Sequence, residues 1–169
     1  MKKSITVRRF LLVSLIIFSA SCAKVSHAQS DDHPNLKAAK LMIAATENKD
    51  IETLMSFFTE DAIFAQPFNP QGVDYAYSSK EAIRAGFEGI FKLIDTMSYK
   101  NKAFTPSNDG SVVFFEAQGD MQLSGSGKDY DNMYVFRVDF DKNGKVTKLT
   151  EYMNSLYLAK TFNVLKSGE

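Results

Sequence analysis

The stretch Lys145–Leu156, near the end of the chain, constrains the fold more than any other part of the sequence. It follows Asp141-Lys-Asn-Gly144, a turn sequence that separates two apolar runs rich in β-forming residues. This pattern predicts a hairpin whose second strand is Lys145–Leu156. The strands before it need that strand as a partner, so the second half of the chain is expected to form an antiparallel sheet.

One acid, Glu151, lies inside this predicted strand among apolar and aromatic neighbours. A carboxylate in apolar surroundings is costly to ionise, so its pKa rises. Glu151 is therefore a candidate general acid. The alternative is a glutamate on the outer face of a half-exposed strand, and the sequence leaves both interpretations open.

The first 28 residues resemble an export signal. Residues 1–9 are basic, and Phe10–Ala20 is an apolar run too short to span a bilayer, which takes about 20 residues. Ser26-His-Ala28 fits ordinary cleavage, which predicts a signal peptide of residues 1–28, a tether of 29–33 and a domain of 34–169. Alternatively, Ser19-Ala-Ser-Cys22 resembles a lipobox, with residues 1–21 removed and Cys22 lipidated. Either way we expect a protein that is periplasmic or lipid-anchored at the bacterial cell envelope, with no other membrane contact.

Charge and cysteine usage exclude several classes of function. Residues 1–28 carry five basic residues and no acid, so the 20 basic and 20 acidic residues of the chain leave the body with a net charge of about −5. That balance argues against nucleic acid as a partner. Cys22 is the only cysteine, and His33 is the only histidine beyond residue 28. Cysteine–metal sites, disulfides and histidine-dependent hydrolysis are therefore not expected, and we predict no metal and no organic cofactor.

Hydrophobic periodicity predicts two helices, a short strand, a third helix and then four antiparallel strands. The expected helices are 34–47, capped by Asp32, then 51–58, and 79–95, which opens with a capping box at Ser78–Glu81. The expected strands are 62–66, 99–105, 112–123, 131–141 and 145–156, and a short helix is expected at 157–165. A loop over 67–78 contains Pro67, Pro70 and three aromatic residues, which favours a lid or a pocket wall.

Alternation assigns two faces to the long strand 112–123. Val113, Phe115 and Ala117 share one face, while Phe114 and Glu116 share the other. The mixture of apolar and polar positions suits a sheet that curls around a cavity. It equally suits an ordinary solvent face.

The order of elements resembles the cone-shaped α+β fold shared by nuclear transport factor 2, ketosteroid isomerase and the SnoaL-like polyketide cyclases. Three segments carry the resemblance: 48–64, 79–87 and 143–154. The resemblance covers residues 34–160 and implies three N-terminal helices on a curved, mostly antiparallel sheet. It also implies a homodimer, because members often pair through the open sheet face.

Within that superfamily, Glu151-Tyr-Met-Asn154 and Pro67-Phe-Asn-Pro70 resemble segments of the phenazine-biosynthesis proteins, in which the glutamate is a pocket acid. The resemblance thus implies that Glu151 is the acid here, although the pocket histidine of that group has no counterpart. The ketosteroid isomerases place an aspartate base where this chain has Gln66. An amide cannot abstract a proton, so steroid isomerisation is not expected.

We therefore expect an exported protein that binds a small apolar or aromatic molecule in an aromatic-lined pocket. Glu151 is the candidate catalytic residue for isomerase- or cyclase-like acid chemistry, and Arg137 is a further polar candidate near it. The candidate ligand-binding residues are Phe64, Gln66, Phe68, Tyr75, Phe87, Phe91, Phe114, Glu116, Tyr134 and Tyr152. The alternative function is a non-catalytic binding or dimerisation module of the cell envelope.

Overall fold

A computed structural model describes residues 33–72 and 75–164 of the chain. Its helices and strands, in chain order, are α1 (Pro34–Glu47), α2 (Ile51–Ser56), β1 (Phe58–Ala65), β2 (Ala76–Ser78), α3 (Lys80–Leu93), β3 (Ile94–Pro106), β4 (Val112–Leu123), β5 (Asp129–Tyr130), β6 (Met133–Phe140), β7 (Val146–Met153) and α4 (Ser155–Thr161). The predicted export signal lies outside these described residues. Among the helices that are described, none is long and apolar enough to cross a bilayer.

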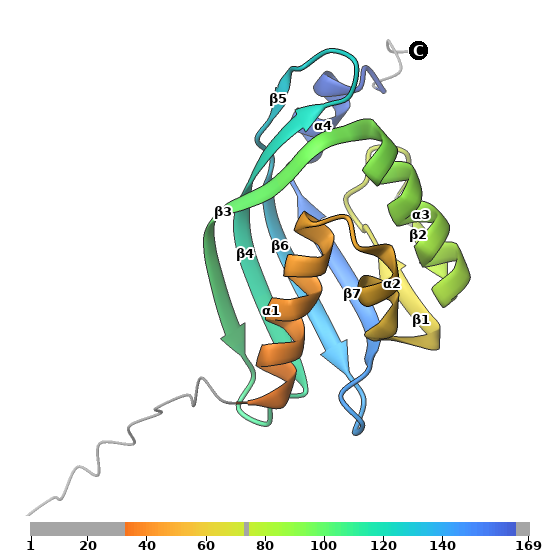
Figure 1. The fold of residues 1–169 in the computed structure, drawn as a ribbon, viewed down its shortest axis with the longest axis vertical. Coiled ribbons are helices and arrows are strands. Elements are labelled where there is room, and N and C mark those ends of the chain that lie inside the picture. The colour runs from red at the N-terminus through yellow and green to blue at the C-terminus, as the bar shows by residue number, and fades with distance from the viewer. Residues whose placement is uncertain (1–32, 73–74, 165–169) are drawn as a thin grey trace, which may run out of the picture.

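The strands form a curved sheet in the order β2-β1-β7-β6-β4-β3, with β5 paired to the end of β4. β1 and β7 run parallel, and the other neighbouring strands run antiparallel. Helices α1, α2 and α3 cover one face of the sheet, and α4 lies at its end beside β5 (Figure 1). The predicted α+β class, with three N-terminal helices on a curved and mostly antiparallel sheet, is confirmed.

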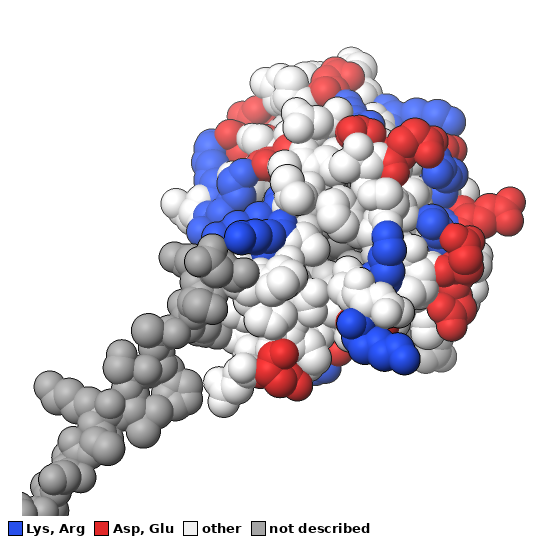
Figure 2. All heavy atoms as spheres, turned by 60° about the horizontal axis from the view of Figure 1, so that its bottom comes forward, with Lys and Arg blue, Asp and Glu red and all other residues white. Residues whose placement is uncertain are grey.

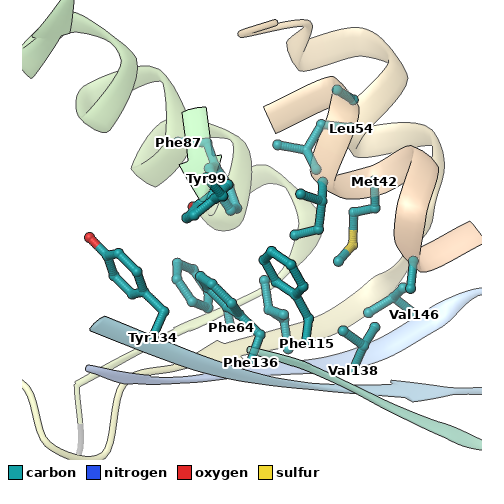
Figure 3. Packing of buried hydrophobic residues seen from close by; sticks show 14 of the residues in the cluster. Met42, Leu54, Phe64, Phe87, Tyr99, Phe115, Tyr134, Phe136, Val138 and Val146 are labelled. Atoms are coloured by element: carbon teal, nitrogen blue, oxygen red, sulfur yellow. The ribbon is translucent and has the colours of Figure 1, made fainter. Parts of the chain in front are cut away.

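The core lies between that covered face and the helices. The alternation predicted for β4 is confirmed, because Val113, Phe115 and Ala117 are buried while Glu116 is exposed. Figure 3 shows Phe115 facing Met42 of α1. Complete burial of such a side chain contributes roughly 1.5–3 kcal/mol, so this layer fixes how the helices sit on the sheet.

The helix caps differ from the predicted ones by one residue. His33 caps α1, because its Nδ1 accepts a hydrogen bond from the Asn35 backbone N–H at 3.2 Å. The predicted cap, Asp32, is outside the described residues. In α3 the cap is Ser79 rather than Ser78, and its Oγ accepts from the Ala82 N–H at 3.1 Å. Both caps satisfy N–H groups that the first helical turn leaves unpaired.

Two strand boundaries also differ from prediction. β1 begins at Phe58 rather than at residue 62, because pairing with β7 extends it back to the Phe58–Val146 position. The predicted loop 67–78 ends in the short strand β2, whose residues pair with the end of β1. Proline and aromatic content indicated the loop. The edge strand β2 could not be predicted, because three residues are too few to show an alternating sequence pattern.

The final strand ends earlier than predicted, at Met153, and α4 begins at Ser155 rather than at residue 157. Asn154 causes both differences. Its side chain accepts a hydrogen bond from the Tyr157 N–H at 3.1 Å and so caps α4. An asparagine cap competes with strand continuation, because its side chain replaces the missing helical partner.

β3 bends the sheet. Its register with β4 shifts between Ile94 and Thr96 and again between Lys100 and Ala103. At the second shift Asn101 has a φ of 55°. Bulges of this kind bend a strand and increase its twist, and here they curl the sheet toward α3 (Figure 1).

Charged side chains of both signs are spread over the surface. Four ion pairs within the described residues join separate elements: Lys80–Glu60 at 2.9 Å, Arg84–Glu52 at 2.6 Å, Lys102–Glu47 at 2.6 Å and Lys100–Asp120 at 2.7 Å. Figure 2 shows one face on which acidic and basic residues surround an uncharged centre. Exposed pairs of this kind contribute at most about 1 kcal/mol each, so burial rather than charge holds the fold.

Candidate functional site

A cavity of about 340 Å³ opens between the inner face of the sheet, α3, the loop after β1 and the C-terminal segment. Its walls are mainly aromatic and aliphatic, with Glu151, Gln66 and five tyrosines as the main polar groups. The aromatic lining residues are Phe64, Tyr75, Tyr77, Phe87, Tyr99, Tyr130, Tyr134, Phe136 and Phe162. An apolar cavity with a few convergent polar groups is the usual form of a small-molecule site.

Glu151 is buried in β7 and lines this cavity. It pairs across the sheet with Phe136 of β6, so its apolar surroundings are imposed by strand register. Its Oε2 accepts a hydrogen bond from the Gln66 side-chain amide. Burial raises the pKa of Glu151 to about 7, while the hydrogen bond from Gln66 lowers it.

Gln66 follows β1 directly, and its side-chain carbonyl accepts a hydrogen bond from Asn69 Nδ2 at 2.8 Å. The parallel pairing of β1 with β7 brings the end of β1 beside Glu151. Gln66 was predicted to contact the ligand; the structure places it between the acid and the loop. An amide at this position can hold a carboxyl group but cannot remove a proton.

The tyrosines form a second polar layer. The hydroxyls of Tyr75 and Tyr77 lie 2.9 Å apart, and burial together with that hydrogen bond raises the pKa of Tyr77 to about 12. Burial, reinforced by the nearby Glu151 carboxyl, raises the pKa of Tyr99 far above its usual range. The phenols of Tyr77 and Tyr99 therefore stay neutral at physiological pH and can only exchange hydrogen bonds.

Tyr99 lies at the centre of the aromatic wall. Its ring packs edge to face with Phe115, Tyr134 and Phe136, with ring centroids 5.5–6.1 Å apart. Within the described residues its hydroxyl forms no hydrogen bond, and every fully buried polar side-chain atom there does have a partner. The Tyr99 hydroxyl therefore opens to the cavity. Figure 3 shows it and the Tyr134 hydroxyl on the side away from Met42.

The structure brings together six of the predicted site residues. They are Phe64, Gln66, Tyr75, Phe87, Tyr134 and Glu151. Phe64 stacks on Phe87 with ring centroids 5.3 Å apart, so β1 and α3 supply one continuous wall. That any of these residues contacts a ligand remains a prediction.

Five predicted residues do not line this cavity. Phe114, Glu116 and Tyr152 lie on the outer face, because each immediately neighbours an inward residue in its strand. Phe68 is exposed and contacts Tyr152 with ring centroids 5.7 Å apart. Phe91 packs against the core beside Phe87 without reaching the cavity. These five side chains therefore lie outside the cavity around Glu151, and their contact with a ligand stays a prediction.

Arg137 also lies outside the cavity. Its guanidinium pairs with Asp139 at 2.6 Å and lies 6.0 Å from the ring of Phe114. Within the described residues, the cavity lining contains no lysine, arginine or histidine. Glu151 therefore has no cationic partner there, and its ionisation is opposed by burial alone.

Sequence reasoning missed Tyr77, Tyr99 and Tyr130 as lining residues. Tyr77 belongs to the aromatic loop that was singled out, yet the direction of its side chain depends on pairing between β1 and β2. Tyr99 precedes a bulge, so the alternation of its strand is broken. Tyr130 lies in a strand of two residues, which is too short for any period.

In the described part of the chain, no group of three or more His, Cys, Asp or Glu side chains could hold a metal ion. What the site offers is a carboxyl group that titrates near neutral pH, fixed by an amide and surrounded by neutral phenols. Such a group can donate or accept a proton at a bound molecule.

The sequence model of the SnoaL-like domain family matches residues 39–149. The chain belongs to this family. Among relatives, "Uncharacterized protein YesE" of Bacillus subtilis strain 168 is 25% identical over 114 residues, which cover 68% of this chain and 77% of that protein. This SnoaL-like chain therefore shares most of its described length with a bacterial relative.

Solved structures with the same fold include a candidate isomerase from Bacillus subtilis, with a TM-score of 0.67 and 23% identity over 75% of this chain and 91% of that one. A phenazine biosynthesis-related protein from Pseudomonas aeruginosa aligns with a TM-score of 0.64 and 15% identity, covering 79% of this chain and 85% of the other. At these identities the likeness establishes the fold of the SnoaL-like chain.

Proposed function

We propose that this SnoaL-like protein binds a small apolar or aromatic molecule in the cavity around Glu151. The observation that carries the proposal is a buried carboxyl group, held by Gln66, inside a cavity of about 340 Å³. That volume suits a compact molecule of one to three rings. A neutral polar group on the molecule would pair with Glu151 or with the hydroxyl of Tyr99.

We further propose that Glu151 acts as an acid on the bound molecule in an isomerase- or cyclase-like reaction. Support comes from its position and from the pKa of about 7, which leaves both protonation states populated near neutral pH. A well-placed general acid accelerates a reaction roughly 10²–10⁴-fold. The structural neighbours described as isomerase and polyketide cyclase are consistent with chemistry of this kind.

The test compares Glu151→Gln with Glu116→Gln. Both exchange a carboxylate for an amide on the same sheet, but Glu116 is exposed on the outer face. Residues 29–169 are screened against neutral bicyclic and tricyclic aromatic ketones and phenols, by the rise in melting temperature and by conversion of each compound. Binding should survive in both variants, and conversion should fall at least 100-fold in Glu151→Gln only.

The result separates the proposed functions. If the wild type converts no bound compound, the acid-catalyst proposal fails and the non-catalytic binding module remains. A screen in which no compound raises the melting temperature would remove the binding proposal as well. Equal conversion by Glu151→Gln and wild type would exclude Glu151 as the acid.

A dimerisation module is the second candidate function, because the outer face carries exposed apolar side chains. Met133 is 57% exposed, and Val135 lies beside it on β6 near Phe68 and Tyr152. These four residues are called the outer patch below. An exposed apolar patch of this kind marks a contact site more often than a plain solvent face.

We also propose that the protein is exported to the cell envelope, on the strength of the basic and apolar residues 1–20. Cell fractionation tests export, and radiolabelled palmitate distinguishes a lipid anchor at Cys22 from cleavage after Ala28. Retention of the full-length chain in the cytosol would overturn the proposal.

A further inference from the structure

We infer that Gln66 and Asn69 are positioning residues that keep the exchangeable proton of Glu151 on its Oε1 oxygen. They form a one-way chain of hydrogen bonds that ends at the other oxygen, Oε2. The inference rests on the proposed role of Glu151 as a proton donor and names the atom from which the proton leaves. It also assigns a function to Asn69, which has no reason to be near an acid on sequence grounds.

Three hydrogen bonds make up the chain. The backbone N–H of Gln71 donates to Asn69 Oδ1 at 2.9 Å. Asn69 Nδ2 donates to Gln66 Oε1 at 2.8 Å. Gln66 Nε2 donates to Glu151 Oε2. Each bond thus runs in the same direction, from the loop toward the acid.

The direction is fixed by chemistry at the outer end. A backbone N–H can only donate, so the oxygen of Asn69 must face Gln71 and its NH₂ must face Gln66. The oxygen of Gln66 must then face Asn69, which leaves the NH₂ of Gln66 for Glu151. If either amide rotated, two carbonyl oxygens or two NH₂ groups would face each other.

The consequence for Glu151 is that Oε2 is always an acceptor. An oxygen that already receives an N–H cannot also carry the acid proton in the same direction. Within the described residues Oε1 accepts no hydrogen bond, and fully buried polar atoms there are all paired. Oε1 is therefore open to the cavity, and it is the oxygen that gains and loses the proton.

The loop that carries the chain is itself held at both ends. The backbone of Gln66 bonds to Tyr75 at 2.9 Å, and the Asn69 N–H donates to the Gln66 carbonyl at 3.0 Å. Ser155 at the start of α4 donates its hydroxyl to the Phe68 carbonyl. These contacts restrict the position of Asn69, so the amides need little ordering when a molecule binds.

Other titratable groups near Glu151 do not compete for this role. Tyr77 of β2, Tyr99 of β3, Tyr130 of β5 and Tyr134 of β6 surround it, and burial raises the pKa of each of these phenols. All four phenols therefore stay neutral at neutral pH. Because these phenols do not titrate at neutral pH, a change in the protonation of Glu151 there reflects a change in the hydrogen bonds of Glu151 itself.

The experiment is a carbon-13 NMR titration of the glutamate side-chain carboxyl groups in the free protein, with Glu151 assigned by its loss in Glu151→Gln. In Asn69→Asp the new carboxylate can only accept, so Gln66 turns its NH₂ to residue 69 and its carbonyl to Glu151. A carbonyl pairs only with the protonated acid. The pKa of Glu151 should rise by about one pH unit, a tenfold change in the protonation equilibrium.

Two further variants control the test. Gln71→Glu adds the same charge to the same loop, but the exposed side chain of residue 71 takes no part in the chain of hydrogen bonds. This variant should raise the pKa of Glu151 by less than a third of the rise in Asn69→Asp. Asn69→Ala releases Gln66 without adding charge and should give an intermediate rise. Equal effects of Asn69→Asp and Gln71→Glu would overturn the inference, as would an unchanged pKa in both Asn69 variants. Because no ligand is added, the outcome is independent of whether the proposed binding function holds.

Discussion

At the scale of single residues, Glu151 shows how far sequence reasoning extends. Its apolar neighbours in the sequence identified Glu151 as a candidate acid, but the same sequence also allowed its side chain to lie on the outer face of the strand. Register decides between the two: Glu151 pairs with Phe136, an inward residue of β6, so the carboxyl faces the cavity. The partner Gln66 is 85 residues away in sequence, a distance at which no local pattern reports a contact.

Burial of Glu151 predicts a pH-dependent stability. The folded pKa of about 7 lies above the ordinary value of 4.5, so the folded state holds the proton more tightly than the unfolded state. Stability from this group is fully present below pH 4.5 and is lost as the pH rises through 7. The full difference is about 3 kcal/mol. Glu151→Gln removes the titration, so its free energy of unfolding relative to wild type should increase by that order between pH 4.5 and 8.

Urea unfolding of wild type, Glu151→Gln and Glu116→Gln at four pH values measures this difference. Wild type and Glu151→Gln share every other ionisable group, so the contributions of those groups cancel in that comparison. Glu116→Gln should follow the wild-type profile within about 0.5 kcal/mol, the usual range for surface changes. A gap between wild type and Glu151→Gln that stays constant with pH would contradict a raised pKa at Glu151.

At the scale of elements, α3 and β2 set the shape of the cavity wall through a close approach at Gly86. A Cβ added at Gly86 would lie 2.8 Å from the ring of Tyr77. The Tyr77 ring has little room to move, because it stacks on Phe64 with ring centroids 5.9 Å apart and its hydroxyl hydrogen-bonds to the Tyr75 hydroxyl. Glycine is therefore required at this point of the helix for steric reasons, although it is a poor helix former.

Two alanine substitutions in α3 test this packing. Gly89→Ala meets nothing within 4 Å, so it should stabilise the protein by about 0.5–1 kcal/mol through helix propensity. Gly86→Ala gains the same propensity but must displace Tyr77, and overpacking costs about 1–3 kcal/mol. We expect Gly86→Ala to melt below wild type and Gly89→Ala above it. Equal melting temperatures for the two variants would show that Tyr77 yields freely.

The elements themselves could largely be predicted, because burial alternates along β4 and α3 has a clear apolar stripe. What failed was the step from element to site. The alternation that placed Phe115 inward also placed Phe114 and Glu116 outward, and both were still assigned to the pocket. Tyr99 was missed for the opposite reason, since a bulge after it breaks the alternation on which the prediction depends.

At the scale of the whole molecule, the sheet separates two different surfaces. Helices α1, α2 and α3 cover the inner face (Figure 1). That face holds the core and the cavity. The outer face carries the outer patch, Phe68, Met133, Val135 and Tyr152, over β6 and β7. Tyr152 of the outer patch directly follows Glu151 in β7. Burial of the outer patch would therefore also restrict the motion of the strand that carries Glu151.

The outer patch leads to a prediction about assembly. We expect wild-type residues 29–169 to form a homodimer through this face, and Val135→Lys to be monomeric, because a charge opposite its own copy is costly to bury. Leu41→Lys is the matched control, since Leu41 is an exposed apolar residue of α1, which lies on the opposite face of the sheet. Analytical ultracentrifugation at micromolar concentrations measures all three. A monomeric wild type would contradict this prediction. So would a dimer that survives Val135→Lys and is lost in Leu41→Lys. Either result would give the outer patch no part in assembly and leave the cavity as the functional surface of this protein.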